Sequence, residues 1–252
     1  MRGWYREWRR RWILRRHGLS DRDWEGLMQR LPAVARYDSN TRNRLRDLVT
    51  LFLHEKSIEP AGGLELSNAE RRLIALQACL PILGLGFEWY DGWRSVIVYP
   101  GEFQARDEFT DESGVVHEIE EERVGEAWPQ GPVVLSWTPG DTPDPDDINV
   151  VIHEFAHKLD LINGVANGMP PLHSDMARDH WTATFTRAYD DFVARADRGD
   201  PLPFDEYAAT DPGEFFAVSS EVFLTAPDRV RDAYPRVYTQ LCAFYRQHPH
   251  TG

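Results

Sequence analysis

Two histidines and a glutamate stand at a spacing that suits metal-assisted hydrolysis, in the stretch His153-Glu154-Phe155-Ala156-His157. In a helix, residues i and i+4 lie on one face, about 40° apart, so the two imidazoles can converge on one ion. Glu154 then projects beside the ion. There it can take a proton from an activated water and pass it to a leaving amine. The H-E-x-x-H pattern is typical of zinc metallopeptidases.

The residues around this motif favour a buried helix. Apolar side chains at helical spacing extend from Ile148 to about Ile162, and Leu159 and Leu161 continue the run beyond the motif. A bare H-E-x-x-H also arises by chance, and its histidines are then structural. An apolar helix supplies the wall that a metal-binding histidine pair needs, so we predict one zinc ion per chain at this site.

A hydrolytic zinc takes three protein ligands and keeps one position for water. The helix expected over 213–224 offers Glu214, which is costly to bury in its apolar run unless it is paired or ligating. Glu221 lies two turns further along the same face. The residues alone leave both open as the third ligand. Asp160 shares the helix face of the histidines, so it either accepts an imidazole N–H or is an ordinary helix-end acid.

The elements that must position these residues are mainly helical. We expect helices over 20–60, 67–81, 148–162, 177–196, 213–224 and 228–247, with Ser67 and Glu70 forming a capping box. Strands are expected at 96–99, at 132–137 and within the acidic segment 101–126, whereas 139–147 and 163–175 read as loops. This pattern predicts an α+β fold: a mainly helical zincin-like metallopeptidase domain with a small central sheet. We further expect Val133–Trp137 to be an edge strand that lines the cleft and pairs with an extended substrate.

The chain of 252 residues, 42% of them hydrophobic, is long enough for one sizeable core. We expect a basic Trp-rich segment over 1–19 and a single domain over 20–252. Within that domain, the expected parts are helical over 20–90, strand-rich over 91–140, and helical with the zinc site over 146–247. No apolar run suits a membrane span, no secretory signal is evident, and two cysteines fit a reducing compartment. The expected location is the cytoplasm.

Charge is distributed unevenly along the chain. The net charge is −13, yet residues 1–16 carry +6, which leaves −19 on the remainder. A domain with this much negative charge repels the phosphates of nucleic acids, which argues against direct nucleic-acid binding. Basic peptides or basic protein surfaces are the expected partners. Trp4, Trp8 and Trp12 recur every four residues. They predict either a helix that touches anionic lipid or, as we favour, a tail that packs on its own domain or stays mobile.

Several segments in the same order resemble the Mlc titration factor A family, and the resemblance runs from about residue 48 to 245. The segments are residues 79–83 (CLPIL), 88–92 (EWYDG), 131–135 (GPVVL), 153–160 (HEFAHKLD), 207–218 (YAATDPGEFFAV) and 220–221 (SE). Phe215 stands where some members have Cys.

The resemblance implies a zinc-dependent peptidase of the gluzincin type, an aminopeptidase or oligopeptidase, with a catalytic domain similar to that of anthrax lethal factor. It selects Glu214 over Glu221 as the ligand beside His153 and His157, with Glu154 as general base. It also implies that Tyr207 faces the metal and stabilises the oxyanion. Asp160 and Glu221 remain candidates for supporting roles. The alternative function is a regulatory protein that sequesters a glucose-responsive transcriptional repressor of the Mlc type.

Overall fold

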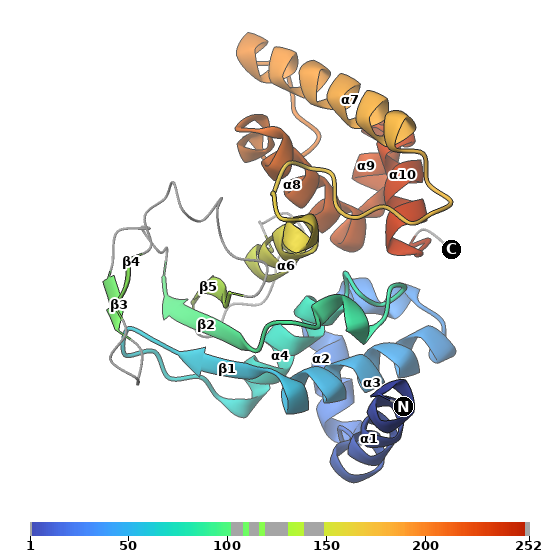
Figure 1. Cartoon of the computed structure of the whole chain (residues 1–252). Helices are drawn as coiled ribbons and strands as arrows, with labels where there is room; N and C mark the ends of the chain where they lie inside the picture. Colours follow the sequence, from blue (N-terminus) through green and yellow to red (C-terminus); the bar gives the residue numbers. More distant parts are fainter. Residues whose placement is uncertain (1, 102–107, 111–115, 119–130, 139–148, 250–252) are drawn as a thin grey trace.

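A computed structural model of the chain describes residues 2–101, 108–110, 116–118, 131–138 and 149–249 (Figure 1). Helices dominate it and a small sheet lies near the middle of the chain, so the predicted mainly helical α+β fold is confirmed. The expected loop 139–147 and most of the acidic segment 101–126 lie outside the described residues. Cys79 and Cys242 are both buried and free.

The N-terminal half is built from four α-helices and short 3₁₀ turns. The helices are α1 (Arg2–His17), α2 (Asp21–Arg30), α3 (Ser39–Glu55) and α4 (Asn68–Cys79); η1 (Pro32–Arg36) lies between α2 and α3, and η2 (Phe87–Tyr90) follows α4. The predicted capping box is present at the start of α4, where the Ser67 hydroxyl accepts from the Glu70 N–H. The helical stretch expected over 20–60 is broken at Pro32, which cannot continue a helix interior.

Three parallel strands form the central sheet in the order β1-β2-β5. They are β1 (Ser57–Pro60), β2 (Ser95–Pro100) and β5 (Val133–Trp137), and a separate antiparallel pair joins β3 (Glu108–Thr110) to β4 (Val116–Glu118). Within the described residues β5 has β2 on one side only, so it is an edge strand of this sheet. Strand β1 was missed because Ile58 is its one buried residue and gives no alternation to read.

The C-terminal half holds α6 (Val150–Asp160) with η3 (Leu161–Asn163), then α7 (Arg178–Arg198) and η4 (Glu206–Ala209). The last helices are α8 (Pro212–Thr225), α9 (Pro227–Ala233) and α10 (Pro235–Tyr245). The single helix expected over 228–247 is therefore two. Pro235 disfavours the helical conformation of Tyr234, which has φ −133° and ψ 69°, and then begins a new helix at its first position.

Helix α6 runs through the middle of the fold, against α8 on one side and against α4 and β5 on the other (Figure 1). Its buried side carries Phe155, whose ring lies 5.7 Å from Phe52, 5.2 Å from Tyr90 and 5.8 Å from Trp93 between centroids. Lys158 Nζ donates to the carbonyl of Gly131 at 2.6 Å, just before β5. These contacts fix the rotation of α6 about its own axis and hence the direction in which its opposite face points.

Helix α1 lies at the end of the molecule away from α7 and packs against α3 (Figure 1). Its Ile13 is fully buried, in agreement with the expectation that this segment packs on its own domain. Among the helices that the structure describes, α1 included, none has the length and apolar character needed to cross a bilayer.

Candidate metal centre

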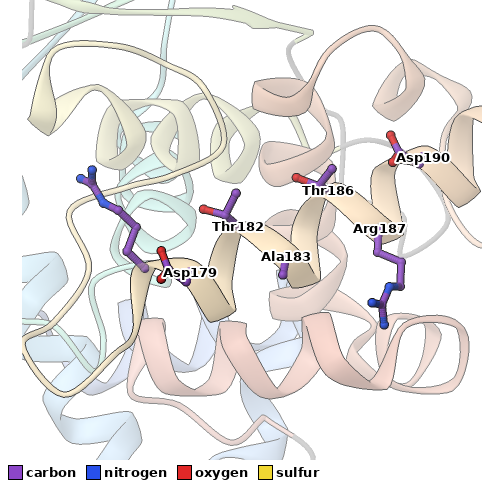
Figure 2. Close-up of a pocket in the computed structure, with 7 residues that line it drawn as sticks. Asp179, Thr182, Ala183, Thr186, Arg187 and Asp190 are labelled. Atoms are coloured by element: carbon purple, nitrogen blue, oxygen red, sulfur yellow. The ribbon is translucent and has the colours of Figure 1, made fainter.

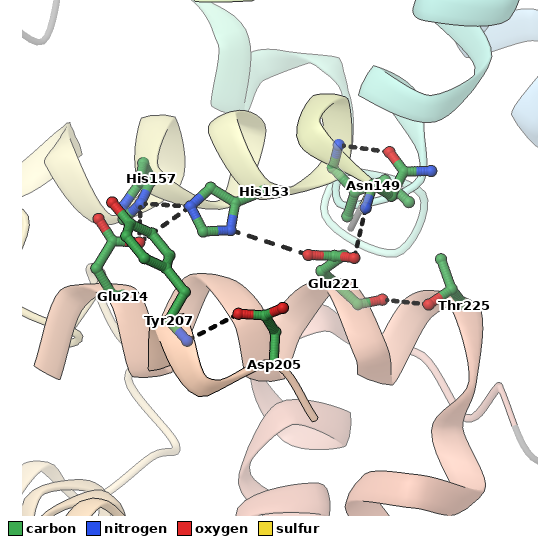
Figure 3. A network of polar contacts seen from close by, with 9 residues as sticks. Asn149, His153, His157, Asp205, Tyr207, Glu214, Glu221 and Thr225 are labelled. Carbon is green, nitrogen blue, oxygen red and sulfur yellow. Dashed lines mark hydrogen bonds and ion pairs between the residues drawn. The ribbon is translucent and has the colours of Figure 1, made fainter. Parts of the chain in front are cut away.

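Local capping fixes where α6 begins and therefore which of its residues share a face. Asn149 is the N-cap: its side-chain oxygen accepts from the backbone N–H of Ile152 at 3.0 Å. With the first turn set there, His153 and His157 lie one turn apart on the face turned toward α8 (Figure 3). In the sequence, an asparagine directly before an apolar periodic run is a helix-start signal, and Asn149 could have located the beginning of this helix.

The first turn of α8 delivers a carboxylate to the same place. Asp211 is the N-cap and accepts from the backbone N–H groups of Gly213 and Glu214 at 2.7 and 3.0 Å, while Pro212 occupies the first helical position. This cap holds Glu214 at the helix start, with its side chain directed at the two histidines (Figure 3).

Three side-chain atoms meet in a nearly equilateral triangle. The Nε2 atoms of His153 and His157 lie 3.1 Å apart, and Glu214 Oε2 lies 3.0 Å from the first and 3.2 Å from the second. Around a tetrahedral ion with metal–ligand distances of about 2.0–2.1 Å, neighbouring ligand atoms are about 3.3 Å apart. The residues present therefore fit one metal ion held on three sides, a group that the described residues bring together.

The electrostatics of the triangle also suit a cation. Burial raises the pKa of Glu214, but hydrogen bonds and attraction from His153 and His157 outweigh it and bring that pKa down to about 2. Burial lowers the pKa of the His157 imidazole, and contact with Glu214 outweighs this and raises it. In the absence of an ion, the contact with Glu214 thus favours a proton on the His157 imidazole. A metal ion would take the place of that proton.

Glu154 stands beside the triangle rather than in it. It is partly buried, and this burial raises the pKa of its carboxyl group, with the carboxylate of Glu214 adding to the rise and the two histidines opposing it. A carboxylate with a raised pKa holds a proton more readily than an ordinary glutamate does. That is the property a group needs if it is to accept a proton from water and deliver it elsewhere.

Tyr207 leans over the triangle from the short helix η4 (Figure 3). The side chain of Asp205 accepts from its backbone N–H at 2.8 Å, and its ring lies 6.1 Å from that of His153. Burial, followed by the carboxylates of Glu214 and Glu154, raises its pKa to about 12, so the hydroxyl keeps its proton at neutral pH. The residue is 49% exposed, which is unusual for packing and suits a donor facing a bound molecule.

Glu221 supports the site from behind. Its Oε1 accepts from the backbone N–H of Asn149 at 2.6 Å, and its Oε2 lies 3.9 Å from Nδ1 of His153. Burial raises the Glu221 pKa to about 7, and His153 opposes the rise. The carboxylate therefore faces the ring nitrogen that points away from the triangle, at a separation longer than a hydrogen bond.

Asp160 contacts the loop that follows α6 and not an imidazole, which disfavours the first of its two expected roles. Its Oδ2 accepts from the backbone N–H of Gly168 at 2.6 Å, and within the described part of the chain no hydrogen bond joins it to an imidazole. Burial raises its pKa to about 6. The carbonyl of Gly168 in turn accepts from Trp181 Nε1 at 2.9 Å. Asp160 therefore fastens the loop after α6, and helix spacing alone could not distinguish that from an imidazole contact.

Gly168 links this loop to the helix that carries Glu214. Its φ is +77°, and a Cβ atom added there would lie 2.4 Å from the carbonyl oxygen of Pro212. Both the left-handed backbone and the close approach require glycine. The sequence places a glycine in this loop but does not reveal the contact with Pro212.

We expect Gly168→Ala to lower the free energy of unfolding by about 2–4 kcal/mol, from left-handed strain plus the clash with Pro212. Metal affinity should fall as well, because Pro212 lies two residues before Glu214. Urea unfolding and metal titration measure the two effects. Gly199→Ala is the control, since Gly199 has φ +68° and its added Cβ would contact nothing. Equal losses in the two variants would show that the contact with Pro212 is unimportant.

A shallow hollow of about 610 Å³ lies elsewhere, along the exposed face of α7 (Figure 2). The residues that line it include Arg178, Thr182, Arg187 and Asp190 but none of the residues of the triangle. The chemistry of the metal centre thus belongs to the α6–α8 interface and not to this surface.

Comparison with known proteins agrees with this geometry. Residues 5–246 match the family described as "Glucose-regulated metallo-peptidase M90", a match that begins well before residue 48. The chain is 38% identical over 237 residues to "Mlc titration factor A" of Klebsiella pneumoniae, and this alignment covers 92% of this chain and 88% of that protein. It is 37% identical over 224 residues to the protein of the same name from Yersinia enterocolitica, covering 87% and 83% respectively.

Proposed function

This chain belongs to the glucose-regulated metallopeptidase family M90, and from that membership we propose that it is a zinc-dependent peptidase. His153, His157 and Glu214 would hold the zinc. The observation that carries the proposal is the triangle of two imidazole nitrogens and one carboxylate oxygen, 3.0–3.2 Å apart. Among the residues that the structure describes, three ligands form this group, which is the number that a hydrolytic zinc takes and one fewer than a structural zinc takes.

The chain's own residues divide the proposed reaction between them. When bound, zinc lowers the pKa of water and polarises a carbonyl group. Glu154 would accept a proton from the attacking water and give it to the amine nitrogen as the peptide bond breaks. The protonated hydroxyl of Tyr207 would donate a hydrogen bond to the carbonyl oxygen as negative charge grows on it. Glu221 would keep the ring of His153 in one orientation throughout.

We propose an extended peptide as the substrate, processed by an aminopeptidase or oligopeptidase activity. Strand β5 offers its free edge within the described sheet and lies against α6, so a peptide can pair with its backbone on the way to the metal. The −19 charge of residues 17–252 favours basic peptides.

The experiment that tests the proposed activity is digestion of a peptide library, with and without a chelator, read by mass spectrometry. Cleavage that stops on chelation and returns on zinc addition supports the proposal, and the pattern of cut sites separates end-directed from internal cleavage. Cleavage that is unaffected by a chelator, in a protein shown to have lost its metal, would exclude it.

The relatives bear the name "Mlc titration factor A", and this name suggests a second function. We propose as the alternative that this chain binds a transcriptional repressor of the Mlc type, with peptidase activity secondary. A variant that cannot hydrolyse but keeps its fold and metal separates the two functions, since repressor binding should survive in it.

The two glutamates of α8 should differ in their effect on the metal. We expect Glu214→Gln to reduce zinc affinity far more than Glu221→Gln. Glu214 contributes an atom to the triangle, whereas Glu221 touches only the back of His153. Loss of a carboxylate that orients a metal ligand without itself binding the metal typically weakens metal binding by about 10–100-fold. Competition titration with a chromophoric chelator measures both constants. If Glu221→Gln removes the zinc and Glu214→Gln does not, the ligand assignment is wrong by two helical turns.

A further inference from the structure

The outer face of α1 exposes a row of aromatic side chains. Trp4, Trp8 and Trp12 are 74%, 55% and 42% exposed, and Tyr5 is 59% exposed. Their four-residue spacing places successive indoles about 6 Å apart along one side of the helix. Tryptophan is highly buried on average, so three exposed in a row form a surface that needs a partner.

The inner face of the same helix is already engaged. Ile13 is fully buried, Arg6 pairs with Asp91 at 2.6 Å, and Arg9 pairs with Glu55 at 3.2 Å. Further along, His17 stacks on His54 at 4.9 Å between ring centroids. These contacts hold α1 against the body with the indoles pointing outward. Because α1 already packs on the body through its opposite face, the row of indoles is an exposed surface and not part of this chain's own core.

Positive charge accompanies the aromatic row. At 100° per residue, Arg11 and Arg15 lie on the same half of the helix as the three tryptophans. Both are exposed, and neither has an acidic partner among the residues that the structure describes. The guanidinium of Arg16 lies 5.7 Å from the ring of Trp12. Indoles next to unpaired arginines match the boundary between lipid headgroups and acyl chains, where tryptophan is enriched and arginine meets phosphate.

We propose that the outer face of α1 docks on membranes that contain anionic lipid, with the helix lying in the plane of the interface. Charge complementarity selects this partner. Residues 1–16 carry +6 while the rest of the chain carries −19, and although Arg6 and Arg9 pair with acids of the body, Arg11 and Arg15 face outward. An anionic surface is therefore attracted to the outer face of α1 and repelled by the acidic remainder. At physiological ionic strength the Debye length is about 8 Å, so the attraction acts only near the face of α1 and the repulsion only near the acidic surfaces. Helix α1 lies at one end of the fold, where a flat surface can reach it (Figure 1). The inference does not depend on the peptidase function.

The test is flotation of the full chain with vesicles of phosphatidylcholine alone and with vesicles containing about one-third phosphatidylglycerol. Binding is expected to the anionic vesicles and to be lost at high salt. Arg11→Glu with Arg15→Glu should weaken binding by roughly thirtyfold or more, from the loss of two lipid-facing charges. Trp4→Ser with Trp8→Ser and Trp12→Ser should weaken it by a similar factor at unchanged charge.

The matched control is Arg178→Glu with Arg187→Glu, since both residues are exposed on α7; Arg187 is labelled in Figure 2. It makes the same change in net charge on a different surface and should leave vesicle binding within about twofold of the parent. Circular dichroism and thermal unfolding establish that each variant is folded. Equal loss in the control, or full binding by the tryptophan variant, would overturn the proposal. So would concentration-dependent self-association without vesicles that the tryptophan variant abolishes, since the row would then be a protein interface.

Discussion

Replacing Glu154 by Gln is expected to reduce kcat by about 10²–10⁴, the range that proton transfer by a positioned side chain contributes. The amide is nearly the same size as the carboxylate but cannot accept a proton from water. Glu154 lies beside the triangle and contributes no atom to it, so zinc content should stay near one per chain. Steady-state hydrolysis of a peptide found in the library digest, with metal analysis of the same sample, measures both quantities.

The control for this variant is His157→Ala, which should lose activity together with the metal, because His157 Nε2 is one corner of the triangle. Binding to a candidate repressor can be measured on both variants. Near-native kcat in Glu154→Gln would remove this residue from the reaction. Loss of zinc from that variant would instead place its carboxylate among the ligands.

The second large effect is expected for Tyr207→Phe, which removes only a hydroxyl group. In the transition state, negative charge grows on the carbonyl oxygen, and a hydrogen bond to that oxygen strengthens as it does. Removal of one such donor typically costs on the order of 10²–10³ in kcat. KM should change much less, since the interaction belongs to the transition state.

The position of Tyr207 allows the effect of its hydroxyl on catalysis to be separated from effects on folding. Its side chain is half exposed and its backbone is held by Asp205, so the fold and the zinc content should survive the loss of the hydroxyl. Tyr189→Phe is a matched control, because that hydroxyl donates to the carbonyl of Ala209 at 3.0 Å and is not drawn into the triangle. A Tyr207→Phe enzyme as active as the Tyr189→Phe enzyme would reduce Tyr207 to a packing role.

The local parts of the site could be predicted from the sequence because they depend on helix geometry alone. His153 and His157 share a face at any i, i+4 spacing within a helix, and the helix itself follows from its apolar pattern. The capping box at Ser67 and the strands near residues 96 and 133 are equally local. Strand β1 was not predictable in this way, since its one buried residue carries no periodicity.

The third corner of the triangle was beyond local reasoning, because it depends on how two helices pack. Asn149 contacts Glu221 and His157 contacts Glu214, so α6 and α8 run antiparallel. Had they packed in parallel, Glu221 would lie near His157 and the roles would be exchanged. Helical periodicity gives the faces of each helix but not their relative direction, and only the family resemblance separated the two glutamates.

Both ends of that antiparallel pair are joined by contacts between protein atoms alone. Asn149 binds Glu221 at one end. At the other end, Asp160 binds the backbone of Gly168, and Gly168 packs closely against Pro212. We therefore expect metal to enter and leave a frame that is already assembled, unlike a zinc finger, which folds only around its ion. The exchange would switch chemistry on and off while leaving the outer surfaces unchanged. A molecule that contacts only those outer surfaces would then not distinguish the metal-loaded form from the metal-free form.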